Sequence, residues 1–157
     1  MGDTAAKWAR LAGLSGWQWW VLLTAPFALF ATWVSLRFTG YRATLARCQP
    51  ARPSGLEKEA ELEAARDTAF ALAVATKYGP WRPRCLLRSL ALARYLGRRG
   101  IASELRIGLP SGTAIPMSSS APDFSAHVWV ECHGAVLNDR DDIADQFRPF
   151  DAPSGQS

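Results

Sequence analysis

Two segments far apart in the chain each place a reactive side chain at the end of an expected secondary-structure element. The first begins at Pro83, has the apolar spacing of an amphipathic helix and carries Cys85 in its opening turn. The second, residues 124–139, alternates as a β-hairpin does, with His133-Gly134 as the turn. A helix joined to hairpins in this way predicts an α+β fold, with helices packed on a small antiparallel sheet.

Cys85 is expected in the first helical turn, because Pro83 suits the first helical position and Gly100 would end the helix. Unpaired N–H groups and the positive end of the helix dipole favour a thiolate there. The surrounding residues add positive charge and no acid: Arg82, Arg84, Arg88, Arg94, Arg98 and Arg99. Taken alone, a cysteine in this position is more often a small buried apolar residue; together with the hairpin described next, these features favour a nucleophile. The Cys85 backbone N–H would contribute to an oxyanion hole.

The hairpin is expected to bring a histidine and an acid together. If the turn is centred on His133, His127 lies opposite Asp139, with Cβ atoms about 5 Å apart. The carboxylate would then orient the imidazole and stabilise its protonated form. With the cysteine, this pair has the composition of a triad that attacks amide bonds. Asp141 and Asp142 are the substitutes if the register differs.

Four motifs carry a resemblance to a known family: Cys-Leu-x-Arg-Ser-Leu-Ala-Leu at 85–92, Gly-Arg-Arg-Gly-Ile at 97–101, Phe-x-Ala-His-x-Trp-Val-Glu at 124–131 and Val-Leu-Asn-Asp at 136–139. Across roughly residues 65–150 the chain resembles the lasso peptide biosynthesis B2 proteins, which are leader peptidases with a transglutaminase-like, papain-related core.

The resemblance implies that Cys85 is the nucleophile, His127 the base and Asp139 the orienting acid. It implies cleavage of a ribosomally made precursor peptide between its leader and its core. It also implies a separate leader-recognition protein, the B1 protein, as partner, and a lasso cyclase that closes the macrolactam ring.

Residues 1–53 are expected to form a hydrophobic helical extension with a linker, ahead of a cysteine peptidase domain at 54–157. The run from Trp17 to Leu36 holds no charge and is long enough for a membrane span, but Pro26 and several polar residues interrupt it. We interpret it first as a packed helix or partner interface, with peripheral membrane contact or a true span as alternatives. The extension is too short for the recognition domain of fused relatives, which favours a split system in the cytoplasm.

The charge distribution and the absence of certain motifs indicate which classes of ligand this chain is expected to bind. Residues 1–50 carry five basic residues and one acid, whereas residues 51–157 carry thirteen of each. The basic extension suits anionic lipid or an acidic partner, while nucleic acid is disfavoured because the aromatics do not alternate with the arginines. No metal or other cofactor is expected, since the chain has no Cys-x-x-Cys and no Gly-rich phosphate loop. Cys48 and Cys132 are expected to be bystanders.

The remaining segments fill in the expected layout. Residues 54–57 predict a capping box for a helix to about Lys77. The apolar face of that helix, expected to cover the sheet, is Leu62, Ala65, Ala69, Leu72 and Ala73. Residues 101–109 predict a strand, and residues 110–123 a loop that borders a substrate cleft.

Two other functions fit the same residues. One is a different transglutaminase-like enzyme, an amide-transferase or general peptidase with the same triad; acyl transfer would leave a cross-linked product and hydrolysis a free leader acid. The other is a non-catalytic, membrane-associated scaffold, which an unreactive Cys85 would favour.

Overall fold

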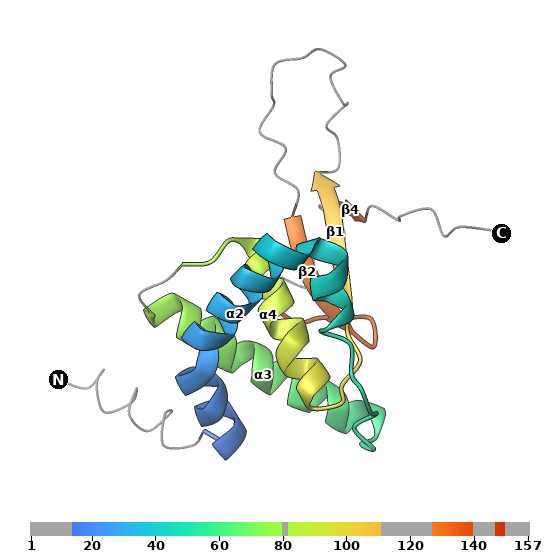
Figure 1. The fold of residues 1–157 in the computed structure, drawn as a ribbon. Coiled ribbons are helices and arrows are strands. Elements are labelled where there is room, and N and C mark those ends of the chain that lie inside the picture. The colour runs from blue at the N-terminus through green and yellow to red at the C-terminus, as the bar shows by residue number, and fades with distance from the viewer. Residues whose placement is uncertain (1–13, 80–81, 111–126, 140–146, 150–157) are drawn as a thin grey trace, which may run out of the picture.

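The computed structural model describes residues 14–79, 82–110, 127–139 and 147–149 (Figure 1). The expected α+β class, with helices on a small antiparallel sheet, is confirmed. The elements of these residues, in chain order, are α2 (Gly16–Ala46), α3 (Lys58–Tyr78), α4 (Cys85–Arg98), β1 (Glu104–Pro110), β2 (His127–Cys132), β3 (Ala135–Val136) and β4 (Phe147–Pro149).

The sheet has the strand order β3-β2-β1-β4, and each neighbouring pair is antiparallel. Strand β2 pairs with β1 from Glu104↔Glu131 to Gly108↔His127, so His127 is the first paired residue of β2. The expected hairpin turn is confirmed: His133 and Gly134 have φ values of 51° and 81°. Positive φ at both positions is what a two-residue hairpin turn with the native strand twist requires.

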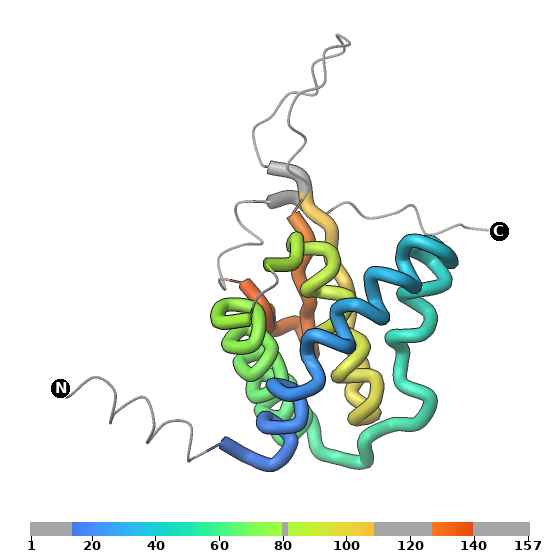
Figure 2. Tube along the Cα trace, turned by 60° about the vertical axis from the view of Figure 1, so that its left-hand side comes forward, coloured from blue at the N-terminus to red at the C-terminus, as the bar shows by residue number. Residues whose placement is uncertain are grey.

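Helix α4 is the central helix of the fold. It packs against α2 and α3 and also contacts the sheet through β1 and β2 (Figures 1 and 2). Its apolar side chains Leu90, Leu92 and Leu96 are fully buried. Truncating such a leucine to alanine typically costs about 2–5 kcal/mol. Because α4 begins at Cys85, the candidate nucleophile lies at the start of a helix whose side chains are anchored in the core.

Helix α3 differs from expectation at its start. The predicted capping box is wrong: α3 begins at Lys58, and its N-cap residue Glu57 makes no side-chain capping bond. Instead, the Ser54 hydroxyl accepts from the Leu56 N–H and bonds to Glu61 one turn into the helix. The end of α3 is confirmed, with Gly79 as C-cap.

The predicted apolar face of α3 is partly correct. Ala65, Ala69 and Leu72 are buried, but Ala73 is exposed. The helix packs mainly against α2 and α4, and α4 takes the place against the sheet that was expected for α3. The small side chains of α3 suit this role, because they let α2 approach closely.

Helix α2 is longer than the uncharged run and packs on both other helices. Its Val21, Ala25 and Leu29 belong to the same core cluster as Leu72 of α3 and Val130 of β2. By length and composition α2 could cross a membrane, a test that core helices and signal sequences also pass. The predicted division of the chain after residue 53 stays a prediction.

The irregular segment that follows α2 is packed on the end of α4. A Cβ added to Gly97 would lie 2.1 Å from the Cys48 carbonyl oxygen, and one added to Gly100 would lie 2.7 Å from the Arg52 oxygen. Gly100 also has a φ of 77°, which L side chains rarely adopt. The two glycines therefore allow the predicted linker at 49–53 to dock on the central helix.

Candidate active site

The first feature of the site is the start of α4. Arg84 is the N-cap residue, with φ −63° and ψ 159°, and Cys85 is the first helical residue. Pro83 therefore precedes the helix, which corrects the prediction that it occupies the first helical position. The first backbone bond of this helix runs from the Arg88 N–H to the Arg84 oxygen, at 3.1 Å. Since the first N–H groups of a helix have no acceptor within it, the turn that contains Cys85 offers donors to an anion.

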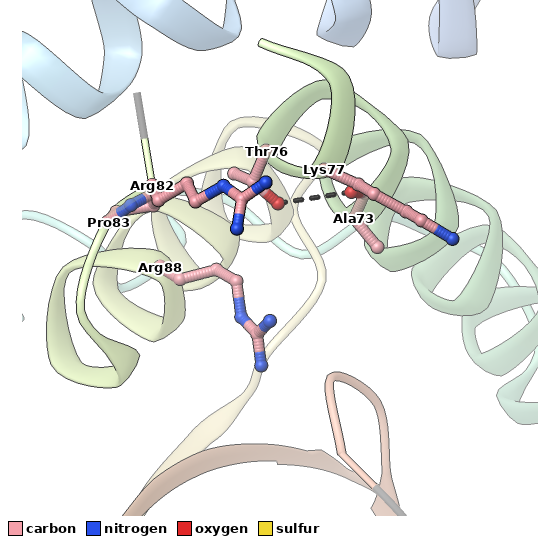
Figure 3. Close-up of a pocket in the computed structure, with 6 residues that line it drawn as sticks. All are labelled: Ala73, Thr76, Lys77, Arg82, Pro83 and Arg88. Atoms are coloured by element: carbon pink, nitrogen blue, oxygen red, sulfur yellow. Dashed lines mark hydrogen bonds between the residues drawn. The ribbon is translucent and has the colours of Figure 1, made fainter. Parts of the chain in front are cut away.

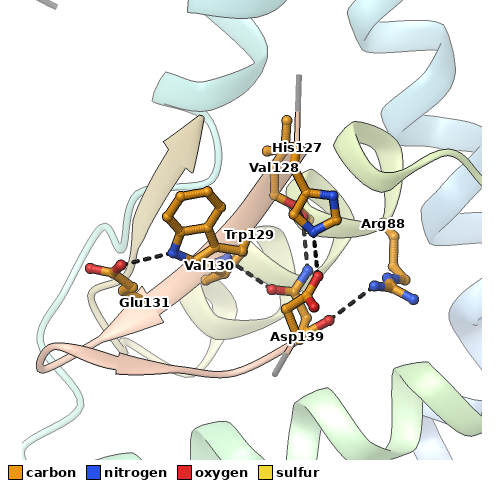
Figure 4. Close-up of polar contacts among 9 residues, drawn as sticks. Arg88, His127, Val128, Trp129, Val130, Glu131 and Asp139 are labelled. Atoms are coloured by element: carbon orange, nitrogen blue, oxygen red, sulfur yellow. Dashed lines mark hydrogen bonds and ion pairs between the residues drawn. The ribbon is translucent and has the colours of Figure 1, made fainter. Parts of the chain in front are cut away.

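The second feature is the pair formed by His127 and Asp139. Nε2 of His127 bonds to Oδ2 of Asp139, and both side chains are largely buried (Figure 4). The imidazole also stacks on Trp129, with ring centroids 6.3 Å apart and an interplanar angle of 22°. Trp129 is fully buried, and its Nε1 donates to Glu131 at 2.8 Å. The histidine is thus held by a carboxylate on its edge and by an aromatic ring on its face.

The predicted register of the hairpin is off by one residue. Glu131 pairs with Val136 and Cys132 with Ala135, which centres the turn between residues 133 and 134. In a continued ladder, Asp139 would not lie opposite His127. Strand β3 ends at Val136, and the Leu137 N–H still donates to the Val130 oxygen at 3.0 Å; the chain then leaves the ladder, which brings Asp139 to the imidazole. The alternatives Asp141 and Asp142 lie outside the described residues.

Asn138 controls this departure from the ladder. Its Oδ1 accepts from the Val130 N–H at 2.8 Å, in the position where a paired strand would offer a backbone carbonyl. Its Nδ2 donates to the Ser89 hydroxyl of α4 at 2.8 Å, and that hydroxyl donates to the Val128 oxygen at 2.9 Å. Arg88 donates to the Asn138 oxygen at 2.9 Å (Figure 4). Three hydrogen bonds therefore fix Asn138, the residue that precedes Asp139, and a fourth ties Ser89 to strand β2.

Arg88, Ser89 and Asn138 had no assigned role in the sequence interpretation. The signal for them was present, because Arg88 and Ser89 belong to the Cys-Leu-x-Arg-Ser motif and Asn138 precedes Asp139. Nothing in the sequence alone tells a buried network of this kind from surface polar residues. The structure ties these two motifs together.

The start of α4 and the start of β2 lie at the same end of the molecule (Figures 1 and 2). Cys85 precedes Ser89 by four residues, so both lie on one face of the helix. Ser89 bonds to the backbone of Val128, the neighbour of His127. This geometry directs the face of α4 that carries Cys85 toward the end of β2 that carries His127.

The other cysteines and the second histidine lie in different surroundings. Cys48 is buried, and its thiol donates to the Thr44 oxygen at 3.2 Å; burial raises its pKa. Cys132 is also buried, and burial followed by the negative charge of Glu61 raises the pKa of its thiol. His133 bonds to Glu61 at 2.7 Å, at the turn end of the hairpin. Within the part of the chain that the structure describes, no three His, Cys, Asp or Glu side chains gather in a way that could hold a metal ion.

A known superfamily matches most of this chain. The profile of the Transglutaminase-like superfamily matches residues 21–151, which contain most of α2 and every later element of the structure. No curated protein and no solved structure matches the chain. Members of this superfamily are usually enzymes with a Cys-His-Asp triad. Because the match covers well over half of its residues, the chain belongs to the transglutaminase-like superfamily.

Proposed function

We propose that this chain is a cysteine peptidase that removes the leader from a ribosomally made lasso peptide precursor. The observation that carries the enzymatic part is the bond between His127 and Asp139, held by Asn138 and Ser89 beside the helix start that bears Cys85. Superfamily membership supports a cysteine hydrolase or transferase. The lasso leader as substrate is supported by the resemblance of the 85–92 and 124–139 motifs to the B2 proteins.

The proposed reaction has two steps. The Cys85 thiol gives its proton to His127, and the thiolate attacks the carbonyl carbon of the residue that ends the leader. The C–N bond breaks, His127 passes the proton to the leaving amine of the core peptide, and a thioester remains on Cys85. Water then gives a proton to His127 and attacks the thioester, which releases the leader acid and restores the thiol.

The surrounding groups would lower the barrier in distinct ways. Asp139 holds the imidazole and stabilises the imidazolium that forms in both steps. The Cys85 N–H, at the start of α4, would stabilise the negative charge on the carbonyl oxygen during attack. Removal of one such donor typically costs a factor of about 10²–10³ in kcat.

The partner in this proposal is a separate leader-recognition protein, and a lasso cyclase would act on the released core in the cytoplasm. The exposed face of α2 supports a docking role, because large apolar side chains rarely gather on a surface without a partner or a membrane. We call this face the α2 aromatic stripe; its members are Trp19, Trp20, Leu23, Phe27, Phe30, Trp33 and Phe38.

The decisive experiment combines the chain with a precursor peptide, a leader-recognition protein and no cyclase, and follows the products by mass spectrometry. Hydrolysis gives a free leader acid and a core with a free amino terminus, and Cys85→Ala abolishes both. Cys48→Ala, a change at a buried thiol, serves as the matched control and keeps wild-type turnover. Wild-type cleavage by a folded Cys85→Ala variant would exclude the cysteine-peptidase proposal.

The second candidate is an acyltransferase, which superfamily membership also supports. Its reaction would form the same acyl-enzyme as the proposed peptidase and would differ only in the second step. An amine would then replace water in attacking the thioester. The same mass spectra distinguish it, since transfer yields an amide cross-link in place of the free leader acid.

A further inference from the structure

A basic pocket lies beside the start of α4. It has a volume of about 500 Å³ and is formed by the end of α3 and the residues on both sides of Cys85 in the sequence (Figure 3). The described residues that line it are Ala73, Thr76, Lys77, Arg82, Pro83 and Arg88. Three of these side chains are basic and none of them is acidic, so the pocket would attract an anion.

The guanidinium of Arg88 uses only some of its hydrogen-bond donors in this pocket. One of its terminal nitrogens donates to the backbone oxygen of Asn138 at 2.9 Å, but its Nε is buried and makes no hydrogen bond to any residue that the structure describes. A buried charged donor without an acceptor is destabilising, so an anion that reaches Nε from the pocket would relieve this cost. A guanidinium also offers parallel donors that match the two oxygens of a carboxylate.

Arg82 provides a second guanidinium in the same pocket. Its side chain extends from the segment before α4 toward Thr76 on α3 (Figure 3). The Thr76 hydroxyl donates to the Leu72 and Ala73 oxygens of its own helix, which leaves the arginines as the groups suited to an anion. Lys77 also lines the pocket, and its ammonium lies 5.5 Å from the centre of the Tyr78 ring.

The pocket is close to the proposed nucleophile. Arg88 follows Cys85 by three residues on one helix, a spacing that places Cβ atoms about 5–6 Å apart. An extended peptide advances about 3.3 Å per residue. A group bound by Arg88 would therefore belong to a substrate residue within about three positions of the bond that Cys85 attacks.

We propose that Arg82 and Arg88 form a subsite that binds a carboxylate of the peptide substrate, carried by a residue within about three positions of the scissile bond. The proposal rests on the peptidase function proposed above for the nature of its ligand. The carboxylate belongs either to an Asp or Glu side chain or to a free carboxyl terminus, and both present the same chemistry to the two guanidinium groups.

The test measures binding without turnover. The full chain carrying Cys85→Ala is labelled and applied to an array of immobilised, otherwise randomised octapeptides with Glu or Gln fixed at each position in turn. A parallel set carries a free carboxyl or an amide at the carboxyl terminus. We expect about tenfold stronger binding of Glu than Gln at one position, or of the free acid over the amide, because hydrogen bonds to charged groups are the strong ones.

Arg82→Gln in the same background should reduce this preference to near one, and Arg82→Glu should reverse it in favour of Gln. The matched control is Arg84→Gln, which removes the same charge next to Cys85 from a side chain that does not line the pocket. Arg82 is the better test position because Arg88 also holds Asn138. Circular dichroism melts confirm that each variant is folded.

Three results would overturn the proposal: no preference for a carboxylate at any position, a preference that survives Arg82→Gln, or an equal loss in Arg84→Gln. None of these depends on cleavage, because the Cys85→Ala chain has no nucleophile. A failed array would leave the proposed peptidase function intact, and a failed cleavage assay would leave the array result intact.

Discussion

The bond between Nε2 of His127 and the carboxylate of Asp139 gives the two imidazole nitrogens different roles. A neutral histidine whose Nε2–H faces a carboxylate carries its proton there and has the lone pair on Nδ1. Nδ1 is then the nitrogen suited to accept the thiol proton from Cys85. The stack on Trp129 fixes the plane in which that lone pair points.

The first prediction concerns these two residues. His127→Ala should reduce kcat as severely as Cys85→Ala, because both proton transfers of the proposed reaction pass through the imidazole. Asp139→Asn should be less damaging, with a loss of about 10²–10⁴ in kcat, since part of the imidazole still adopts the productive tautomer. Steady-state kinetics on a cleavable precursor measure both effects.

His133→Ala is the matched control, because His133 bonds to Glu61 at the far end of the hairpin. It should retain wild-type kcat. An inactive His133→Ala together with an active His127→Ala would exclude the roles assigned to His127 and Asp139.

The second prediction concerns Asn138. Asn138→Ala should lower the free energy of unfolding by about 2–4 kcal/mol, because it leaves the Val130 N–H without an acceptor and Ser89 without a donor. It should also lower kcat, since the side chain of Asn138 holds the segment that places Asp139 next to His127. Urea denaturation and kinetics on the same sample give the two values.

A double-mutant cycle with Ser89→Ala tests whether the hydrogen bond between Asn138 and Ser89 itself contributes to stability, as distinct from an independent loss at each position. If Ser89 and Asn138 act as one unit, the double variant should lose less stability than the two single losses added together, by about 0.5–3 kcal/mol. Strict additivity would show that the two side chains stabilise the fold independently.

The sequence predicted much of this fold because its local signals agree with one another. Helical spacing after Cys85, alternation around Val128 and the His133-Gly134 turn each depend on residues close in the chain. The start of α3 was missed because the Ser54 hydroxyl bonds to Glu61 rather than capping the helix. That choice depends on tertiary placement, which a local motif does not encode.

The candidate site was predicted for a partly incorrect reason. Asp139 was expected to reach His127 through strand pairing, whereas the contact depends on a chain that leaves the ladder and is held by Asn138. The network that joins Asn138 to α4 spans 49 residues of sequence separation. Such a contact can be derived only once helix and hairpin are packed together.

The third prediction concerns the reactivity of the cysteines. Iodoacetamide at neutral pH should alkylate Cys85 well before Cys48 or Cys132. Both of the latter are buried, and burial raises the pKa of each thiol, so little reactive thiolate is present. Peptide mapping by mass spectrometry over a time course measures the three rates. Labelling of Cys48 or Cys132 first, in folded protein, would contradict the assignment of the nucleophile and favour the non-catalytic scaffold.

The fourth prediction concerns acid stability. The hydrogen bond from Ser54, and then that from His133, holds the pKa of Glu61 below its ordinary value. A depressed pKa in the folded state means that the ionised carboxylate stabilises the fold above its unfolded pKa of about 4.3, and that this contribution is lost as the pH falls through the folded pKa. The difference in Tm between the wild type and Glu61→Gln should therefore be largest near pH 7 and shrink below about pH 4.

Glu63→Gln, a change at an exposed glutamate of the same helix, is the control for this measurement. The Tm of this variant should equal that of the wild type both near pH 7 and below about pH 4. A constant difference between wild type and Glu61→Gln across the pH range would mean that the Ser54 and His133 contacts do not depend on the charge of the carboxylate.

The last prediction tests whether the α2 aromatic stripe binds the proposed leader-recognition partner. Phe27 is 76% exposed and Phe30 is 56% exposed, so replacing both with Gln should change the free energy of unfolding by no more than about 0.5 kcal/mol each. The variant should nevertheless lose partner binding in a pull-down. When the wild-type chain is used, the partner holds the leader near the active site at an effective concentration in about the millimolar range. The partner should therefore accelerate cleavage about 10²–10³-fold at low micromolar precursor. The variant should not show this acceleration.

Phe70→Gln is the matched control, because Phe70 is 57% exposed on α3, outside the α2 aromatic stripe. It should bind the partner and respond to it as the wild type does. Binding to vesicles that contain anionic lipid tests the alternative that the stripe contacts a membrane. If the Phe27→Gln/Phe30→Gln variant loses vesicle binding but keeps partner binding, the stripe is a membrane contact, to which the basic residues of the extension would add electrostatic attraction. Full activity of the wild-type chain alone at low micromolar precursor would contradict the split system, because recruitment by a partner would then add nothing to the capture of the leader.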